Sequence, residues 1–93
     1  MSVSIKSEKE IARMREAGKI LFEVHERLAE MVAPGVTTKE LDRRAAEIIR
    51  SYGCTASFLN YNGFPASICA SVNDEVIHGI PDKKRFLKEG DII

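Results

Sequence analysis

The chain has 93 residues, which is enough for one domain, and its 14 basic residues balance 14 acidic residues. Zero net charge argues against a dedicated nucleic-acid-binding protein, which usually carries a basic excess, and gives no reason to expect an anionic membrane as partner. No apolar run approaches the roughly 18 residues that span a bilayer. The N-terminal segment also lacks the apolar core of a signal peptide.

The two cysteines, Cys54 and Cys69, do not form a CxxC pair. A disulfide framework in a chain this short usually contains more cysteines. Reduced thiols in a cytosolic protein fit this pattern better, so both cysteines are expected to be packing or pocket residues.

The first expected element is a long amphipathic helix that begins after Ser7 and stops at Pro34-Gly35. Ser7 and Glu10 have the spacing of a capping box, in which each residue binds the other's main-chain N–H. Apolar residues recur at steps of three and four along one face: Ile11, Met14, Ala17, Leu21, Val24, Leu28 and Met31.

A second helix is expected to begin at a capping box formed by Thr37 and Glu40. Its apolar stripe is Leu41, Ala45, Ile48, Ile49 and Tyr52, and Gly53 is suited to end it. Because few residues join the two helices, they are expected to pack as neighbours.

Strand and turn patterns follow Gly53. The expected strands are Cys54–Leu59, Ser67–Val72, Glu75–Ile80 and a last one that begins at Ile92-Ile93. Asn62-Gly63 is suited to a turn with positive φ, Asn73-Asp74 to a hairpin connection, and Gly90-Asp91 to a further turn.

His78 is the strongest single candidate for a chemical role, because it ends an expected hairpin strand and can face a cleft. A neutral imidazole offers one donor and one acceptor, and it can change protonation state near neutral pH. The local pattern alone leaves open, and slightly favours, a histidine that bonds only to the backbone. The other histidine, His25, lies in the first helix without further ligands at metal-binding spacing.

The aromatic residues Phe58, Tyr61 and Phe64 could line an apolar pocket, to which Cys69 could contribute. Ordinary sheet core is the alternative, and the local pattern favours it. The basic cluster between Lys83 and Lys88 is interpreted as a solvated loop, since it lacks the interleaved aromatics of a single-strand binder.

Four segments in order resemble the N-terminal part of type I methionine aminopeptidases: KSEKEIARMREAGKI, VAPGVTTKELDRRA, NYNGFPASICASVNDEVIHGIPD and LKEGDII. The similarity spans nearly the whole chain and overrides the local preferences above. It implies an α+β fold of the pita-bread (creatinase/aminopeptidase) type, with two helices followed by antiparallel strands. Residues 1–93 would be the N-terminal part of a single catalytic domain, incomplete at the C-terminus.

The resemblance implies metal-dependent removal of the initiator methionine from nascent proteins when the second residue is small. His78 matches a catalytic and substrate-binding histidine near the scissile bond, and four residues match the methionine side-chain pocket: Phe58, Tyr61, Phe64 and Cys69. Some relatives carry Cys and Tyr where this chain has Phe58 and Phe64, which leaves the pocket's shape open.

The resemblance also implies two divalent ions (Co, Mn, Fe or Zn) in the complete enzyme. Their ligands, two aspartates, a histidine and two glutamates, lie beyond the position that matches Ile93. Asp91 belongs to the turn before that strand and is not expected to be a ligand. We therefore expect a fragment that alone binds no metal and has no peptidase activity.

The expected substrates are the N-terminal methionyl peptides of nascent proteins. The complete enzyme is expected to be a monomer that binds them near the ribosome in the cytoplasm. No nucleic acid or membrane partner is expected. Two alternatives stay open: a proline-peptidase relative of the same fold, and a catalytically dead module that binds a peptide end.

Overall fold

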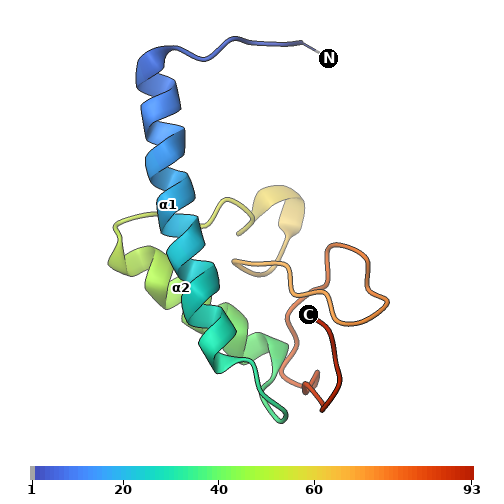
Figure 1. The fold of residues 1–93 in the computed structure, drawn as a ribbon. Coiled ribbons are helices and arrows are strands. Elements are labelled where there is room, and N and C mark those ends of the chain that lie inside the picture. Colours follow the sequence, from blue (N-terminus) through green and yellow to red (C-terminus); the bar gives the residue numbers. More distant parts are fainter. Residues whose placement is uncertain (1) are drawn as a thin grey trace.

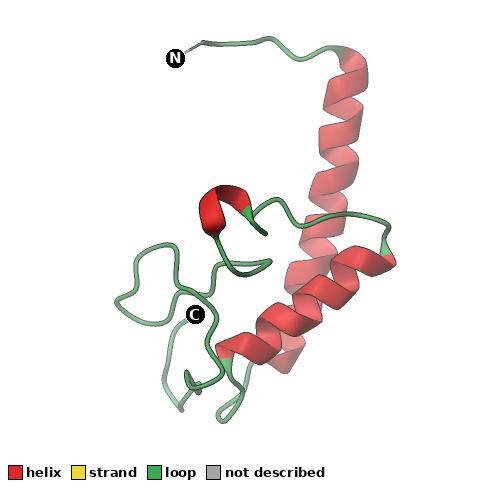
Figure 2. Cartoon of the chain, turned by 180° about the vertical axis from the view of Figure 1, so that it is seen from behind, coloured by secondary structure: helices red, strands yellow, loops and turns green. Residues whose placement is uncertain are grey.

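The computed structural model describes residues 2–93, and these form two α-helices and one 3₁₀ turn. α1 comprises Glu8–Met31, α2 comprises Thr38–Ser51, and the 3₁₀ turn η1 comprises Tyr61–Gly63. Figure 1 shows α1 as a long rod that α2 crosses, and Figure 2 shows the later loops gathered around the first turns of α2. The arrangement makes α2 the element on which the rest of the chain is organised.

Both predicted capping boxes are confirmed. The Glu10 N–H donates to Ser7 Oγ at 3.1 Å and the Ser7 N–H donates to Glu10 Oε1 at 2.8 Å. Thr37 and Glu40 make the same reciprocal pair at the start of α2, with both distances 3.1 Å. Gly53 follows the last turn of α2 with a φ of 72°, as expected of a glycine that ends a helix.

Helix packing buries part of one face of α1, between Ile20 and Met31. Val24 packs against Ala45 and Ile48 of α2, and all three are buried. The predicted stripe on α1 is exposed in its first half, where Ile11 and Met14 are 42% and 61% accessible. The cause is length, because the 14 residues of α2 extend about 21 Å and the 24 residues of α1 about 36 Å.

A second buried cluster attaches the loops to α2. It consists of Leu41 of α2, Val72 and Leu87, with Val36 and Ile68 packed at its edge. These apolar contacts fold the segments after residue 64 back onto the first turns of α2.

The expected antiparallel strands are not formed among residues 2–93, although the turns between them are. Glu75 N–H donates to Val72 O across the Asn73-Asp74 turn, but among the described residues a single main-chain to main-chain bond, from Ala70 N–H to Gly79 O, joins the two arms beyond it. A β-ladder requires successive paired residues. The antiparallel strands therefore stay a prediction for this part of the chain.

The segment expected as strand Cys54–Leu59 differs in a second way. It runs into turns, in which the Leu59 N–H donates to Ala56 O, and Asn60 then takes a left-handed conformation with φ of 65°. A left-handed residue reverses the chain, so an extended strand cannot continue through this point. Within the described part of the chain, neither helix combines the length and apolar content that crossing a bilayer requires.

Candidate functional site

The loop from Phe58 to Phe64 is closed by its own main chain. Tyr61 N–H donates to Phe58 O, Phe64 N–H donates to Tyr61 O, and Asn60 N–H donates to Phe64 O, at 2.9–3.0 Å. Asn60 and Asn62 both have positive φ, which asparagine tolerates better than most residues. These turns bring the three predicted pocket aromatics onto one short loop.

The aromatic rings of this loop face solvent in part. The Phe58 and Phe64 ring centroids lie 6.2 Å apart at 65°, an edge-to-face pair. Phe58 is 50% accessible and Tyr61 is 68% accessible. The rings thus present an apolar surface and do not form sheet core with the described residues.

His78 lies on a second loop that is pressed against the segment containing Cys69. Ala70 N–H donates to Gly79 O at 2.8 Å, and Gly79 N–H donates to Ser71 Oγ at 3.0 Å. A Cβ on Gly79 would collide with the Ala70 carbonyl group, so only glycine fits there. The chain neighbours of Cys69 and His78 are therefore in direct main-chain contact.

The backbone of His78 itself is unusual. Its φ is 60°, in the left-handed region, and its side chain is exposed. This conformation costs a residue with a Cβ about 1–2 kcal/mol, and such residues concentrate at functional sites. The conformation is an independent structural reason to regard His78 as a functional candidate.

Two hollows on the surface are lined by other residues. One of about 400 Å³ lies between the end of α2 and residues 54–59, and its lining includes Ile49, Cys54 and Leu59. Another of about 140 Å³ lies beside Val32 and Leu87. None of the five predicted site residues lines either hollow.

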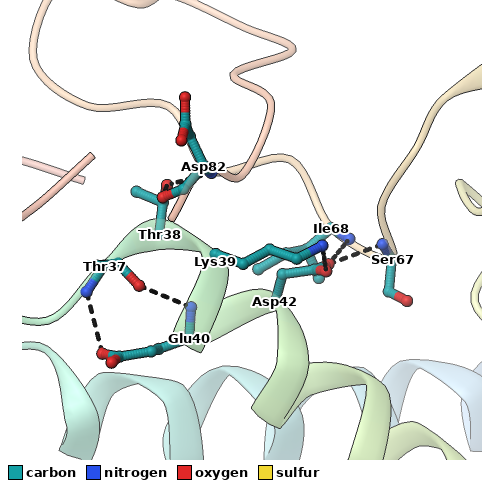
Figure 3. A network of polar contacts seen from close by, with 8 residues as sticks. All are labelled: Thr37, Thr38, Lys39, Glu40, Asp42, Ser67, Ile68 and Asp82. Atoms are coloured by element: carbon teal, nitrogen blue, oxygen red, sulfur yellow. Dashed lines mark hydrogen bonds and ion pairs between the residues drawn. The ribbon is translucent and has the colours of Figure 1, made fainter. Parts of the chain in front are cut away.

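Asp42 of α2 holds the start of the segment that leads to Cys69. Its Oδ1 accepts from the Ser67 N–H at 2.7 Å and from the Ile68 N–H at 3.1 Å, and Lys39 Nζ lies 3.5 Å from its Oδ2 (Figure 3). Asp42 is 6% accessible. A buried carboxylate needs such donors, and here main-chain N–H groups supply them.

Thr38, one turn before Asp42, holds the segment that follows His78. Its hydroxyl accepts from the Asp82 N–H at 2.9 Å and donates to Asp82 O at 3.2 Å (Figure 3). The Thr38 N–H donates to Arg85 O at 3.0 Å. Thr38 is 1% accessible, so these bonds are shielded from water.

The sequence interpretation did not identify Thr38, Asp42 or Gly79. A signal existed for the first two, because their spacing from Ala45 places them on the buried face of α2. A threonine and an aspartate on a buried helix face require hydrogen-bond partners from elsewhere in the chain.

Metal-binding groups do not converge in the part of the chain that the structure describes: no three His, Cys, Asp or Glu side chains are placed to hold an ion. His25 is exposed on α1, and both cysteines are unpaired. Asp91 lies in the predicted turn, where hydrogen bonds from the Asn73 side chain and the Lys88 N–H hold the pKa of its carboxyl below the usual value.

The model of metallopeptidase family M24 matches residues 12–93. The chain belongs to this family. Family M24 proteins among the curated relatives include the methionine aminopeptidase of Clostridium acetobutylicum, 55% identical over 91 residues. Methionine aminopeptidase 1 of Bacillus subtilis is 51% identical over 88 residues.

Two solved structures of methionine aminopeptidases match nearly the whole chain. The methionine aminopeptidase of Rickettsia prowazekii superposes with a TM-score of 0.92 at 42% identity over 97% of the chain. That of Thermotoga maritima gives 0.94 at 34% identity over 98%. Both comparisons confirm the predicted family fold.

The chain spans about a third of the length of these relatives. The match with the Clostridium acetobutylicum protein includes 98% of this chain but 36% of that protein. The matched part is likewise 36% of each solved chain. The activity of the complete relatives is therefore a property of proteins about three times as long as this chain.

Proposed function

We propose that this chain forms the part of a methionine aminopeptidase that holds the N-terminal methionine of the substrate. Residues 1–93 would belong to one catalytic domain whose other residues complete the active centre. The observation that carries this proposal is the match over 98% of the chain, at 55% identity, to a protein named methionine aminopeptidase.

The methionine side chain is proposed to lie against Phe58, Tyr61, Phe64 and Cys69. Three of these are aromatic residues on one closed loop, and their rings are partly uncovered. A thioether makes favourable contacts with aromatic rings and adapts to an irregular apolar surface. This chemistry supports the assignment, since it suits methionine better than a charged or branched polar side chain.

His78 is proposed to contact the substrate beside the scissile peptide bond. Its imidazole is exposed and makes no hydrogen bond with another described residue, so it is available to a ligand. The ring can donate to a carbonyl oxygen or accept from an amide N–H. The left-handed backbone of His78 and the close contact of Gly79 constrain the main chain that carries the ring.

The metal ions are proposed to be bound by residues that this chain does not contain. The family consists of metallopeptidases, and we propose two ions of Co, Mn, Fe or Zn for the complete enzyme. The described residues do not fit such a centre, because no three metal-binding side chains converge among them. These residues are assigned to binding and orienting the substrate.

The substrates would be N-terminal methionyl peptides of nascent proteins with a small second residue. Such an enzyme would act in the cytoplasm, near the ribosome and as a monomer, and unpaired cysteines are compatible with a reducing compartment. The names of the relatives favour methionine removal over the proline-peptidase hypothesis and over a non-cleaving module.

The test is a chimera that joins residues 1–93 to the remaining part of the Clostridium acetobutylicum enzyme. The chimera, supplied with Co²⁺ or Mn²⁺, is expected to release methionine from a Met-Ala-Ser peptide, and a chelator should stop the reaction. The isolated chain is expected to release none under the same conditions.

Two results would contradict the proposal. A folded, metal-loaded chimera that does not cleave methionyl peptides would show that this segment cannot serve the reaction. Turnover by the isolated chain would show that its own residues form the catalytic centre. A Pro-Ala-Ser peptide is the control for specificity.

A further inference from the structure

We propose that Thr38 and Asp42 are positioning residues that orient two parts of the substrate site independently. Asp42 would fix the methionine pocket through the segment before Cys69, and Thr38 would fix His78 through the segment after it. This inference rests on the proposed function, because the roles of Cys69 and His78 come from it.

Asp42 acts on main-chain atoms next to the pocket. Its single Oδ1 atom accepts from two successive N–H groups, those of Ser67 and Ile68, and Cys69 is the next residue. Charge-assisted bonds of this kind are stronger than neutral ones, and the low accessibility of Asp42 keeps water from competing. Because these bonds are made to main-chain N–H groups, they fix the position of the segment before Cys69 independently of its side chains.

Thr38 acts on the other segment in a similar way. Its hydroxyl binds both the N–H and the carbonyl oxygen of Asp82, four residues after His78. Pro81, between them, is buried and has a fixed φ, which stiffens this connection. Movement of Asp82 would therefore be transmitted to His78.

The two anchors are separate although they lie one turn apart. No side-chain hydrogen bond joins Thr38 to Asp42 in the described chain, and each side chain binds a different loop (Figure 3). The segments also meet where Gly79 contacts Ala70 and Ser71, and where Val72 packs with Leu87, but each keeps its own anchor on α2. Loss of one anchor is thus expected to disturb one function of the site more than the other.

A role in stability alone would not require this chemistry. Burying a carboxylate costs free energy, and an apolar side chain at a packed helix position often serves stability as well or better. The two polar side chains instead bind main-chain groups on the two segments that bear the candidate site residues. The arrangement therefore favours positioning over packing as their contribution.

The experiment uses the chimeric enzyme with five variants, one of which, Thr38→Ser, keeps the hydroxyl. Asp42→Asn keeps an acceptor oxygen but removes the charge, and Thr38→Val removes the hydroxyl with little change of shape. Thr37→Val is the matched control for Thr38→Val, because Thr37 is also buried but caps α2 and binds neither loop through its side chain. Glu47→Gln, at an exposed position of α2, is the control for Asp42→Asn.

We expect Asp42→Asn to raise KM for a methionyl peptide about 10-fold with kcat nearly unchanged, because a displaced pocket would hold the methionine side chain less well. Thr38→Val should lower kcat about 10-fold with KM nearly unchanged. Thr38→Ser should restore kcat. Thr37→Val should lower the melting temperature without changing either constant, and Glu47→Gln should change nothing.

Hydrogen exchange supplies a second readout that does not depend on activity. Asp42→Asn should accelerate exchange at the Ser67 and Ile68 amides, and Thr38→Val at the Asp82 amide, each without affecting the other segment. If the chimera is inactive but shows these selective losses of amide protection, the roles of Thr38 and Asp42 as anchors are supported and the proposed function is contradicted.

Two outcomes would overturn the inference in an active chimera. One is that Thr38→Val and Thr37→Val change kcat and KM alike at equal loss of melting temperature. The other is that Asp42→Asn raises KM no more than Glu47→Gln does.

Discussion

The anchored ends of the loops and their exposed tips differ sharply in burial. Ser67 and Leu87 are buried against α2, whereas Tyr61 and His78 are exposed. Hydrogen bonds to α2 fix the ends, whereas turns shape the tips, together with the contact of Gly79 with the neighbouring segment. Under the proposed function, α2 would position the candidate side chains indirectly, by fixing the main chain on either side of them.

The same contrast separates the two halves of α1. Val24 in the second half packs on α2 and is 2% accessible, whereas Met14 in the first half is 61% accessible. The packed half belongs to the scaffold, and the first half projects away from it (Figure 1). Substitutions in the chimeric enzyme can test both contrasts.

The largest effect is expected at an exposed tip. His78→Asn should lower kcat by about 100-fold or more, because a positioned imidazole contributes factors of this size. Its fold should be retained, since asparagine tolerates the left-handed backbone that His78 adopts. Steady-state kinetics and thermal melting measure the two effects separately.

His25→Asn is the matched control, because it makes the same change at an exposed position of α1. It should leave kcat unaltered. Equal losses in the two variants would show that His78 has no special role at the tip.

The next effect concerns the contact between the two loops. Gly79→Ala should destabilise the protein by about 1–3 kcal/mol, since its Cβ would collide with the main chain of Ala70 and require the backbone to shift. Gly18→Ala, near the middle of α1 and two residues before the packed Ile20, has open space around it and should stabilise by about 0.4–1 kcal/mol. Chemical denaturation gives both free energies; changes of the same sign and size would contradict the close contact.

A smaller effect compares the two capping boxes. Thr37→Ala should lower the free energy of unfolding by about 1 kcal/mol, because it frees the first turn of the scaffold helix. Ser7→Ala removes the same chemistry from the projecting half of α1, where fraying is local and the global change should be close to zero. Denaturation measures the first effect and hydrogen exchange at residues 8–11 the second. A global loss from Ser7→Ala as large as that from Thr37→Ala would show that both halves of α1 belong to the scaffold.

The smallest effect is a dependence on pH at the last turn. The Asn73 side chain and the Lys88 N–H lower the pKa of Asp91, so the stabilising bonds are fully formed above the ordinary aspartate pKa. They are lost as pH falls through the lowered value. Protection of the Ile92 amide, whose N–H donates to Asn73 Oδ1, should decrease in that acidic range. Asp91→Asn should abolish the dependence, and an unchanged dependence in that variant would contradict the assignment.

Local sequence patterns predicted what short-range physics determines. The capping boxes at Ser7 and Thr37 and the turn at Asn62-Gly63 depend on residues a few positions apart, and all are present. The antiparallel strands depend on pairing between distant segments, and among residues 2–93 they are not formed. The alternation of residue types within a segment does not show which other segment supplies the hydrogen-bond partners of its main chain.

The site residues stay a prediction from the family resemblance, which points to His78 and the aromatic loop. Their geometry could not be predicted, because neither the left-handed φ of His78 nor its link through Gly79 to Ala70 follows from residue type. The anchors Thr38 and Asp42 could be suspected from their place on the buried face of α2. Their partners, at positions 82 and 67–68, lie 44 and 25–26 residues away, beyond the reach of local patterns.

The most direct test of the central claim is a crystal structure of the chimera with methionine bound. The account predicts that the thioether side chain lies against Phe58, Tyr61, Phe64 and Cys69, with the His78 imidazole beside the carboxyl group of the ligand. Methionine bound away from these residues, with His78 turned from it, would contradict the claim that this chain holds the substrate.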